Sequence, residues 1–191
     1  PELFSLVVGG YGLFGVVVSA TLRLVPRQKV QRVVQMLDVE ALPEAFENRI
    51  GEGYEYGDFQ FCTAPEADDF LRRGVFSCYR PVEDATPIPQ DQRRLTREDW
   101  ERLLYLAHRD KREAFRQFAQ FYLASSGQIY WNDTHQLNIY LEDYHAALDA
   151  RLGAEVPATE MITELYVPRA QLPAFMQSVR KDFLAHGVDL V

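Results

Sequence analysis

A glycine-rich run near the N-terminus constrains the fold more than any other feature of this sequence. Residues 9–15 read Gly-Gly-Tyr-Gly-Leu-Phe-Gly, and Gly10, Gly12 and Gly15 have the G-x-G-x-x-G spacing of a dinucleotide-binding turn. In a Rossmann fold that turn leads directly into a helix, whose N-terminus holds the pyrophosphate. Here three valines follow at 16–18, a β-branched run that favours a strand over a helix.

The spacing of acidic residues also argues against a Rossmann fold. That fold places an acidic residue about 20 positions after the glycines, where it binds the ribose. The nearest acids here, Asp38 and Glu40, fall at the far end of the next predicted strand. The sequence therefore indicates a different kind of glycine loop.

A glycine loop between two strands is the interpretation that remains. Residues 13–25 are rich in leucine and β-branched residues, alternate after Val18 and end at Pro26, as a half-buried strand would. Glycines in such a loop let backbone N–H groups approach a ligand closely. The same pattern fits a tight loop without a ligand, so the local sequence leaves both interpretations open.

The residues around the loop resemble a known cofactor-binding segment. Residues 2–26 begin Glu-Leu-Phe, continue through the glycines and a Phe-Gly pair into the valine run, and end at Pro26. This segment resembles the end of the FAD domain in vanillyl-alcohol-oxidase-type (PCMH-type) flavoproteins. The rest of the chain, including residues 159–168, resembles the cap domain of such bacterial oxidases more loosely. By this resemblance the FAD-side positions are Gly9, Gly10, Gly12, Gly15, Val16 and Val17.

The resemblance implies an FAD-dependent oxidoreductase that oxidises a small organic substrate by hydride transfer to flavin. Residues 1–28 then form the end of the FAD-binding domain, and residues 29–191 form a cap, or substrate, domain truncated at its C-terminus. The remainder of the FAD domain is the implied partner. Because the subdomain that grips the FAD pyrophosphate would precede this chain, we expect the isolated fragment to bind FAD weakly or not at all and to be inactive.

The residues after the glycine segment predict an α+β domain. Thr96, with Asp99 three residues on, is a credible helix N-cap, and Ser125-Ser126-Gly127 ends the long helix that it begins. The other predicted elements are strands at 30–39, 54–63, 70–80, 159–167 and 188–191, and helices at 42–50, 143–152 and 172–183. Two β-α-β halves predict a ferredoxin-like antiparallel sheet with helices packed on one face, preceded by the terminal strand of the FAD domain.

Aromatic and polar side chains that suit a substrate pocket interleave between residues 130 and 145. In the cap-domain interpretation, the expected substrate-binding residues are Trp131, His135, Tyr140, Glu164 and Tyr166. The last two share one face of the predicted strand at 159–167, where a Glu beside a Tyr also suits acid–base chemistry. A solvated surface remains the alternative for both segments.

Composition excludes several other classes. The net charge of −8 argues against a nucleic-acid partner, which needs a basic face. No apolar run reaches the roughly 18 residues of a membrane span. Cys62 and Cys78 are too few for a disulfide framework, and as buried free thiols they fit a cytoplasmic protein.

Two other functions stay open at this level. One is a stand-alone ferredoxin-like module that binds a ligand or a partner without catalysis. The other is a small metal-dependent enzyme built on His135 and His145, although the spacing of these residues matches no common site and we expect no metal. The sequence identifies neither the substrate nor a catalytic base.

Overall fold

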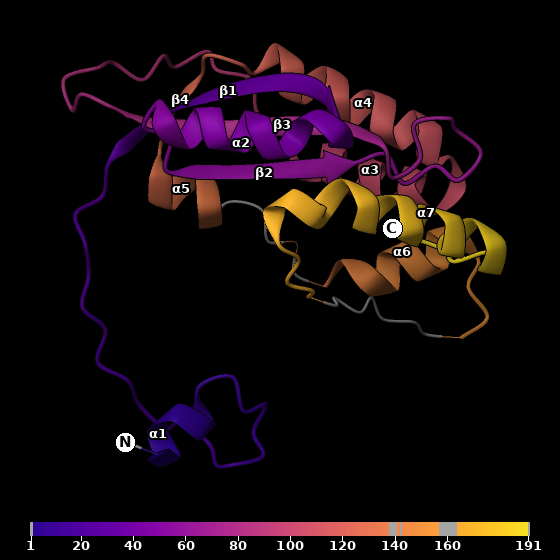
Figure 1. Cartoon of the computed structure of the whole chain (residues 1–191), viewed down its shortest axis with the longest axis horizontal. Helices are drawn as coiled ribbons and strands as arrows, with labels where there is room; N and C mark the ends of the chain where they lie inside the picture. The colour runs from indigo at the N-terminus through magenta and orange to yellow at the C-terminus, as the bar shows by residue number, and fades with distance from the viewer. Residues whose placement is uncertain (1, 138–140, 142, 157–163, 191) are drawn as a thin grey trace.

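A four-stranded antiparallel sheet forms the centre of the computed structural model, which describes residues 2–137, 141, 143–156 and 164–190 (Figure 1). The strands are β1 (Lys29–Asp38), β2 (Tyr56–Phe61), β3 (Arg73–Val82) and β4 (Ile129–Trp131), in the order β2-β3-β1-β4. The helices are α1 (Glu2–Val7), α2 (Leu42–Gly51), α3 (Arg97–Arg109), α4 (Lys111–Ala124), α5 (Asn132–Leu137), α6 (Tyr144–Leu152) and α7 (Leu172–His186), with short 3₁₀ turns at Val39–Ala41 and Arg169–Gln171. The predicted α+β class is confirmed.

The strand order follows from two interleaved β-α-β units. β3 pairs antiparallel with both β1 and β2, so β1 and β2 run parallel with β3 inserted between them. β1 likewise pairs antiparallel with β3 and β4 and separates them. Two split β-α-β units of this kind make the ferredoxin-like arrangement that the sequence predicts.

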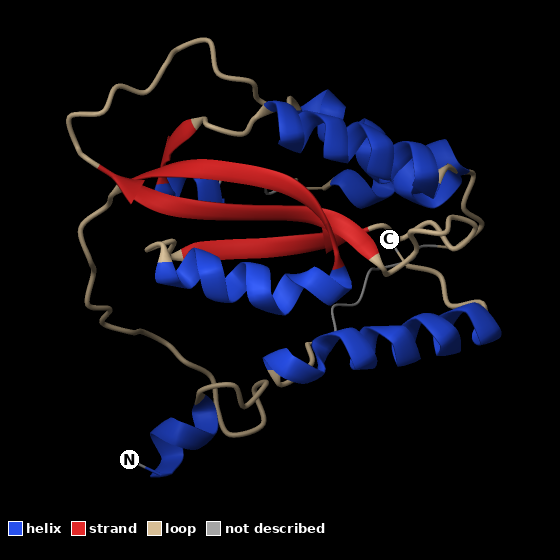
Figure 2. Ribbon diagram, turned by 45° about the horizontal axis from the view of Figure 1, so that its top comes forward, coloured by secondary structure: helices blue, strands red, loops and turns tan. Residues whose placement is uncertain are grey.

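Helices cover both faces of the sheet, whereas the sequence pattern predicts them on one face (Figure 2). Val75 of β3 packs with Ala119 and Tyr122 of α4, while its neighbour Phe76 packs on α2, edge-to-face against Phe46 with ring centroids 4.8 Å apart. The cause lies in β3 itself, because residues 74–79 are buried without alternation and such a strand needs cover on both faces.

The long helix predicted from Thr96 is two helices. Thr96 does cap α3 as predicted, and its side chain and that of Asp99 form a reciprocal capping box. Asp110, with φ −152° and ψ 80°, interrupts the helical backbone, and its carboxylate accepts a hydrogen bond from the N–H of Glu113 at 3.0 Å. Asp110 therefore ends α3 and caps α4, which allows the two helices to pack against each other.

Replacing Asp110 by alanine is expected to lower the free energy of unfolding by about 1 kcal/mol, because the first turn of α4 loses its cap. Urea denaturation followed by circular dichroism measures the change. Asp182→Ala, an exposed site inside α7, is the matched control and should be neutral or slightly stabilising, since alanine is the better helix former. Equal losses at both sites would contradict the capping role.

The C-terminal third departs from the predicted elements. The fourth strand of the sheet is β4, a three-residue strand in a stretch where no strand is predicted. Residues 164–167 and 188–190, expected in strands, have no strand conformation, and most of the strand predicted at 159–167 lies outside the described residues. α6 and α7 match the predicted helices at 143–152 and 172–183.

The N-terminal segment extends away from the sheet (Figure 1). The predicted strand–loop–strand is instead the helix α1, a glycine turn and an extended stretch at 16–28 that pairs with no described strand. The prediction was wrong for a physical reason, because an extended segment becomes a strand only when another backbone satisfies its hydrogen bonds. Val18 is 94% exposed and Leu24 is 84% exposed, so the side chains of this stretch also lack cover.

The two cysteines are confirmed as buried free thiols. Cys78 packs with Leu42 and Phe76 between the sheet and α2, and Cys62 is 2% exposed just after β2. Burial raises the pKa of both thiols, that of Cys78 to about 12, so both stay protonated and unreactive at neutral pH.

Candidate functional site

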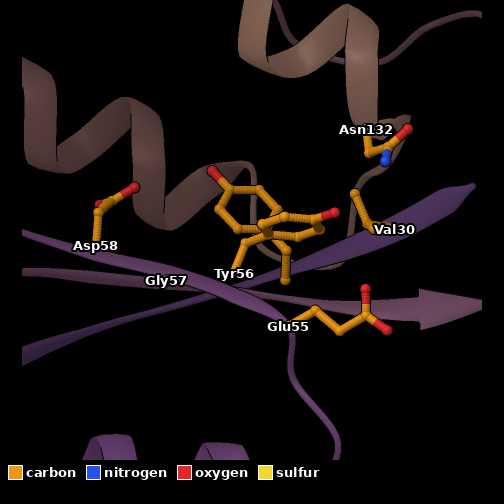
Figure 3. A pocket seen from close by; sticks show the side chains of 7 residues that line it. Val30, Glu55, Tyr56, Gly57, Asp58 and Asn132 are labelled. Carbon is orange, nitrogen blue, oxygen red and sulfur yellow. The ribbon is translucent and has the colours of Figure 1, made fainter. Parts of the chain in front are cut away.

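A pocket of about 400 Å³ opens at the end of the sheet where β1 begins (Figure 3). It lies between the start of β2 and the start of α5, on the face of the sheet that carries α4. Its lining residues are Val30, Glu55, Tyr56, Gly57, Asp58, Tyr79 and Asn132. A pocket of this size suits a small organic molecule.

Strand register brings the polar lining together. Tyr56 of β2 lies directly opposite Tyr79 of β3, and Asp58 lies opposite Ser77. Residues directly opposite in a sheet share a face, so Tyr56, Asp58 and Tyr79 all project towards the pocket side. In Figure 3, Tyr56 and Asp58 rise from the same side of β2, and Asn132 approaches from the start of α5.

Asp58 is the most perturbed acid of the site. Burial raises its pKa from 3.8 to about 6, even though the guanidinium of Arg32 acts in the opposite direction. Its Oδ1 atom is buried and accepts no hydrogen bond from the described part of the chain. A carboxyl group that changes charge near neutral pH inside a pocket is typical of a functional site.

Arg32 is a buried cation beside the pocket residue Tyr79 and is only 3% exposed. Its Nε donates to the hydroxyl of Tyr79 at 3.0 Å, and its Nη1 donates to Oγ of Ser125 at 2.8 Å. The Cζ atom also lies 4.8 Å from the ring centroids of both Tyr122 and Tyr130, so aromatic faces replace part of its hydration. Arg32 therefore fixes the position of the Tyr79 side chain.

Three buried tyrosines around Arg32 remain neutral at physiological pH. Burial raises the pKa of Tyr79, Tyr122 and Tyr130 above the ordinary value, although the Arg32 charge opposes this. The site therefore offers phenol groups that donate or accept hydrogen bonds beside a carboxyl group that exchanges a proton near neutral pH.

The N-terminal segment joins the domain at this pocket. The side chain of Gln28 donates to the carboxylate of Glu55, and its backbone exchanges hydrogen bonds with Asn132, whose Oδ1 accepts from Gln28 N at 3.2 Å. One residue earlier, Arg27 pairs with Asp133 at 2.8 Å and lies 4.2 Å from the ring centroid of Trp131. Two pocket residues thus hold the point where the glycine-bearing segment leaves the domain.

The proposed FAD-side residues lie together on this segment and away from the pocket. Gly9, Gly10, Gly12 and Gly15 form a turn after α1 in which only Gly10 is partly buried, and exposed Val16 and Val17 follow. Gly9, Gly12 and Gly15 have φ values of +74°, +80° and +140°, which favour glycine, and a Cβ on Gly10 would lie 2.2 Å from the carbonyl oxygen of Leu6. The turn therefore requires its glycines.

The proposed substrate-binding residues are not brought together. Trp131 is half-buried in β4, next to the pocket residue Asn132. The backbone of His135 belongs to α5, while its side chain and the whole of Tyr140 lie outside the described residues. Glu164 and Tyr166 are exposed in a segment that is not a strand, and neither lines the pocket.

Sequence reasoning missed Arg32, Asp58 and Tyr79. The signal was present, because Arg32 occupies an inward-facing position between Val30 and Val34 in a strand of alternating burial. A charged residue on the buried face of a strand needs a partner, so its position points to a polar site.

The described residues contain no group of three or more His, Cys, Asp or Glu side chains placed to hold a metal ion. Among the helices that the structure describes, none is both long and apolar enough to cross a lipid bilayer. Comparison with family models, with curated proteins and with solved structures finds no match to this chain.

Proposed function

We propose that this chain is part of an FAD-dependent oxidoreductase that oxidises a small organic substrate by hydride transfer to flavin. Residues 2–28 belong to the cofactor domain in this proposal, and the domain that begins at Lys29 holds the substrate. The observation that carries the proposal is the position of the pocket. It lies at the junction of the two parts, where Gln28 bonds to both Glu55 and Asn132.

The exposed apolar surface of the N-terminal segment supports the assignment to a second domain. Leu13 is 83% exposed, Val16 is 87% exposed and Val25 is 82% exposed. An isolated surface with this many apolar side chains is unfavourable in water, so the segment is expected to be buried by another folded unit. The remainder of the FAD domain is the partner that the resemblance of residues 2–26 implies.

The residues of the two parts have separate roles. Backbone N–H groups of the turn at 9–15 would lie along the FAD, and the glycines leave room for this approach. The flavin would supply the redox chemistry, while the chain binds and orients the substrate. At the pocket, Tyr79 is held by Arg32, and Asp58 can accept or release a proton near neutral pH.

The experiment that tests this function uses the complete product of the gene that encodes this sequence. The purified protein is expected to be yellow, with the visible absorbance of a bound flavin. A colourless protein from flavin-replete cells would refute the oxidoreductase proposal. If that colourless protein still bound a small molecule in the pocket, the ligand-binding module would become the better interpretation.

A matched pair of glycine variants tests the role of the turn. Gly12 (φ +80°) and Gly53 (φ +84°) have nearly the same backbone conformation, and an added Cβ meets nothing within 4 Å at either site. Alanine therefore introduces similar backbone strain of about 1 kcal/mol at both positions. We expect Gly12→Ala to lower the flavin content of the full-length protein severalfold and Gly53→Ala to leave it unchanged. Equal flavin content in the two variants would argue against a flavin at this turn.

A further inference from the structure

Among the residues that the structure describes, the lining of the pocket is acidic and has no basic residue. Glu55 and Asp58 supply two carboxylates from one end of β2, separated by only two residues in the sequence. Arg32, whose charge lowers the pKa of Asp58, is 3% exposed and is not among the lining residues. Its Nε and Nη1 atoms donate to Tyr79 and Ser125, so a bound molecule meets the carboxylates rather than the guanidinium.

Two aromatic rings complete the acidic wall. Tyr56 and Tyr79 lie directly opposite each other on neighbouring strands, on the same face as Asp58. Tyr79 is 3% exposed and its ring already contacts Arg32, so the ring of Tyr56, which is 36% exposed, offers most of the aromatic surface that attracts an organic cation. Carboxylates combined with aromatic faces bind an ammonium group better than they bind a neutral or anionic one.

Asp58 adds an unused acceptor to this wall. Its Oδ1 accepts no hydrogen bond from the described residues, and Ser77, directly opposite, also has a buried hydroxyl oxygen without a described partner. Buried acceptors without donors are unfavourable, whereas an ammonium group brings three donors and a positive charge. Ser77 is fully buried and is not a lining residue, so the carboxyl group of Asp58 is the part of the lining that lacks a hydrogen-bond donor.

We propose that this pocket binds a primary amine as its ammonium ion, with Asp58 and Glu55 as counter-ions and the rings of Tyr56 and Tyr79 along its carbon skeleton. As the substrate class of the enzyme, the assignment rests on the proposed function, which makes this pocket the substrate site. The binding itself requires no flavin. An anion would face both carboxylates, and a neutral alcohol would leave the charge of the wall uncompensated.

Two pairs of probes test the ligand class by isothermal titration calorimetry on the 191-residue chain. Tyramine is compared with tyrosol, and butylamine with butanol, because each pair differs only in an amine against a hydroxyl group. At about pH 8 Asp58 is ionised and both amines are protonated. We expect at least one amine to bind at least tenfold more tightly than its alcohol. Failure of both amines to bind, or equal affinity within both pairs, would overturn the proposal.

Variants assign the binding to this pocket. Asp58→Asn and Glu55→Gln keep side-chain size and remove one charge each, and each is expected to weaken amine binding at least tenfold without weakening alcohol binding. Asp68→Asn, at an exposed loop position outside the pocket, should bind like the unmodified chain. Circular dichroism of each variant confirms that the domain is folded. Amine affinity unchanged in both pocket variants would overturn the assignment.

The result is separable from the test of the oxidoreductase. A yellow full-length protein with no amine binding would refute the ligand class and leave the flavin function standing. A colourless full-length protein whose domain binds amines in an Asp58-dependent manner would refute the flavin function and support the ligand class.

Discussion

Arg32→Met is expected to lower the free energy of unfolding by about 3–5 kcal/mol at neutral pH, the usual loss when one member of a buried charge network is removed. Methionine replaces most of the apolar stem of Arg32 but none of its donors. The hydroxyl groups of Tyr79 and Ser125 lose hydrogen bonds of 3.0 and 2.8 Å, and three tyrosine rings lose the cation that they surround. Asp58 also loses the positive charge that favours its ionised form.

Urea denaturation monitored by fluorescence measures this loss, and Arg80→Met is its matched control. Arg80 lies in β3, is exposed and bonds mainly to Gln31, so its replacement should change stability by no more than about 0.5 kcal/mol. The double variant Arg32→Met with Asp58→Asn should recover part of the loss, because it removes both charges together. A loss below about 1 kcal/mol in Arg32→Met alone would show that the network contributes little to stability.

Most of the sheet could be predicted from the sequence because its signals are local. β1, β2 and β3 are short stretches with several β-branched or aromatic residues, and Thr96 with Asp99 marks the start of α3. The break at Asp110 also has a local signal, since its carboxylate caps the next turn, but the continuous apolar stripe on both sides conceals it. β4 could not be predicted, because three residues show no periodicity and only pairing with β1 makes them a strand.

The helices on both faces and the unpaired N-terminal stretch reflect tertiary effects. The uninterrupted burial of residues 74–79 requires cover on both sides, which the sequence suggests only once β3 is known to be central. The valine run at 16–18 has strand propensity, yet propensity without a partner strand gives only extended chain.

The candidate pocket was the least predictable part because register assembles it. Tyr56, Asp58 and Tyr79 come from two strands, and their common face depends on the pairing of β2 with β3. The sequence predicts that the aromatic stretch around Trp131 lies at a substrate pocket. Its neighbour Asn132 does line the candidate pocket. Asp58 has a raised pKa, and the charge of Arg32 acts on it. In the sequence these two residues belong to separate predicted strands, and only the folded sheet brings them together.

Asp58→Asn is expected to raise the free energy of unfolding by about 2–3 kcal/mol above pH 6, an unusual gain for the loss of a charge. The folded protein raises the pKa of Asp58 from 3.8 to about 6, so the native state binds this proton more tightly than the unfolded chain does. Each tenfold change in a protonation equilibrium corresponds to about 1.4 kcal/mol. Ionisation of Asp58 therefore destabilises the fold progressively from about pH 4 to pH 6, and the full cost is present above that range.

Urea denaturation across this pH range tests the sign as well as the size. The stability difference between Asp58→Asn and the unmodified chain should be near zero at about pH 4 and reach its maximum above about pH 6. Asp68→Asn, whose side chain is exposed, should give a difference that stays near zero throughout. A destabilised Asp58→Asn variant at neutral pH would mean that the Asp58 charge is well compensated in the native state.

The expected gain in the free energy of unfolding is relevant to function, because Asp58→Asn should also weaken amine binding. A carboxylate that destabilises its own domain at neutral pH does not serve to stabilise the fold. The ammonium group of a bound ligand would offset the free-energy cost of desolvating this carboxylate. Added amine should therefore stabilise the unmodified chain more than Asp58→Asn, so that the stability advantage of the variant shrinks as ligand is added. A constant advantage at all amine concentrations would separate the buried charge of Asp58 from ligand binding.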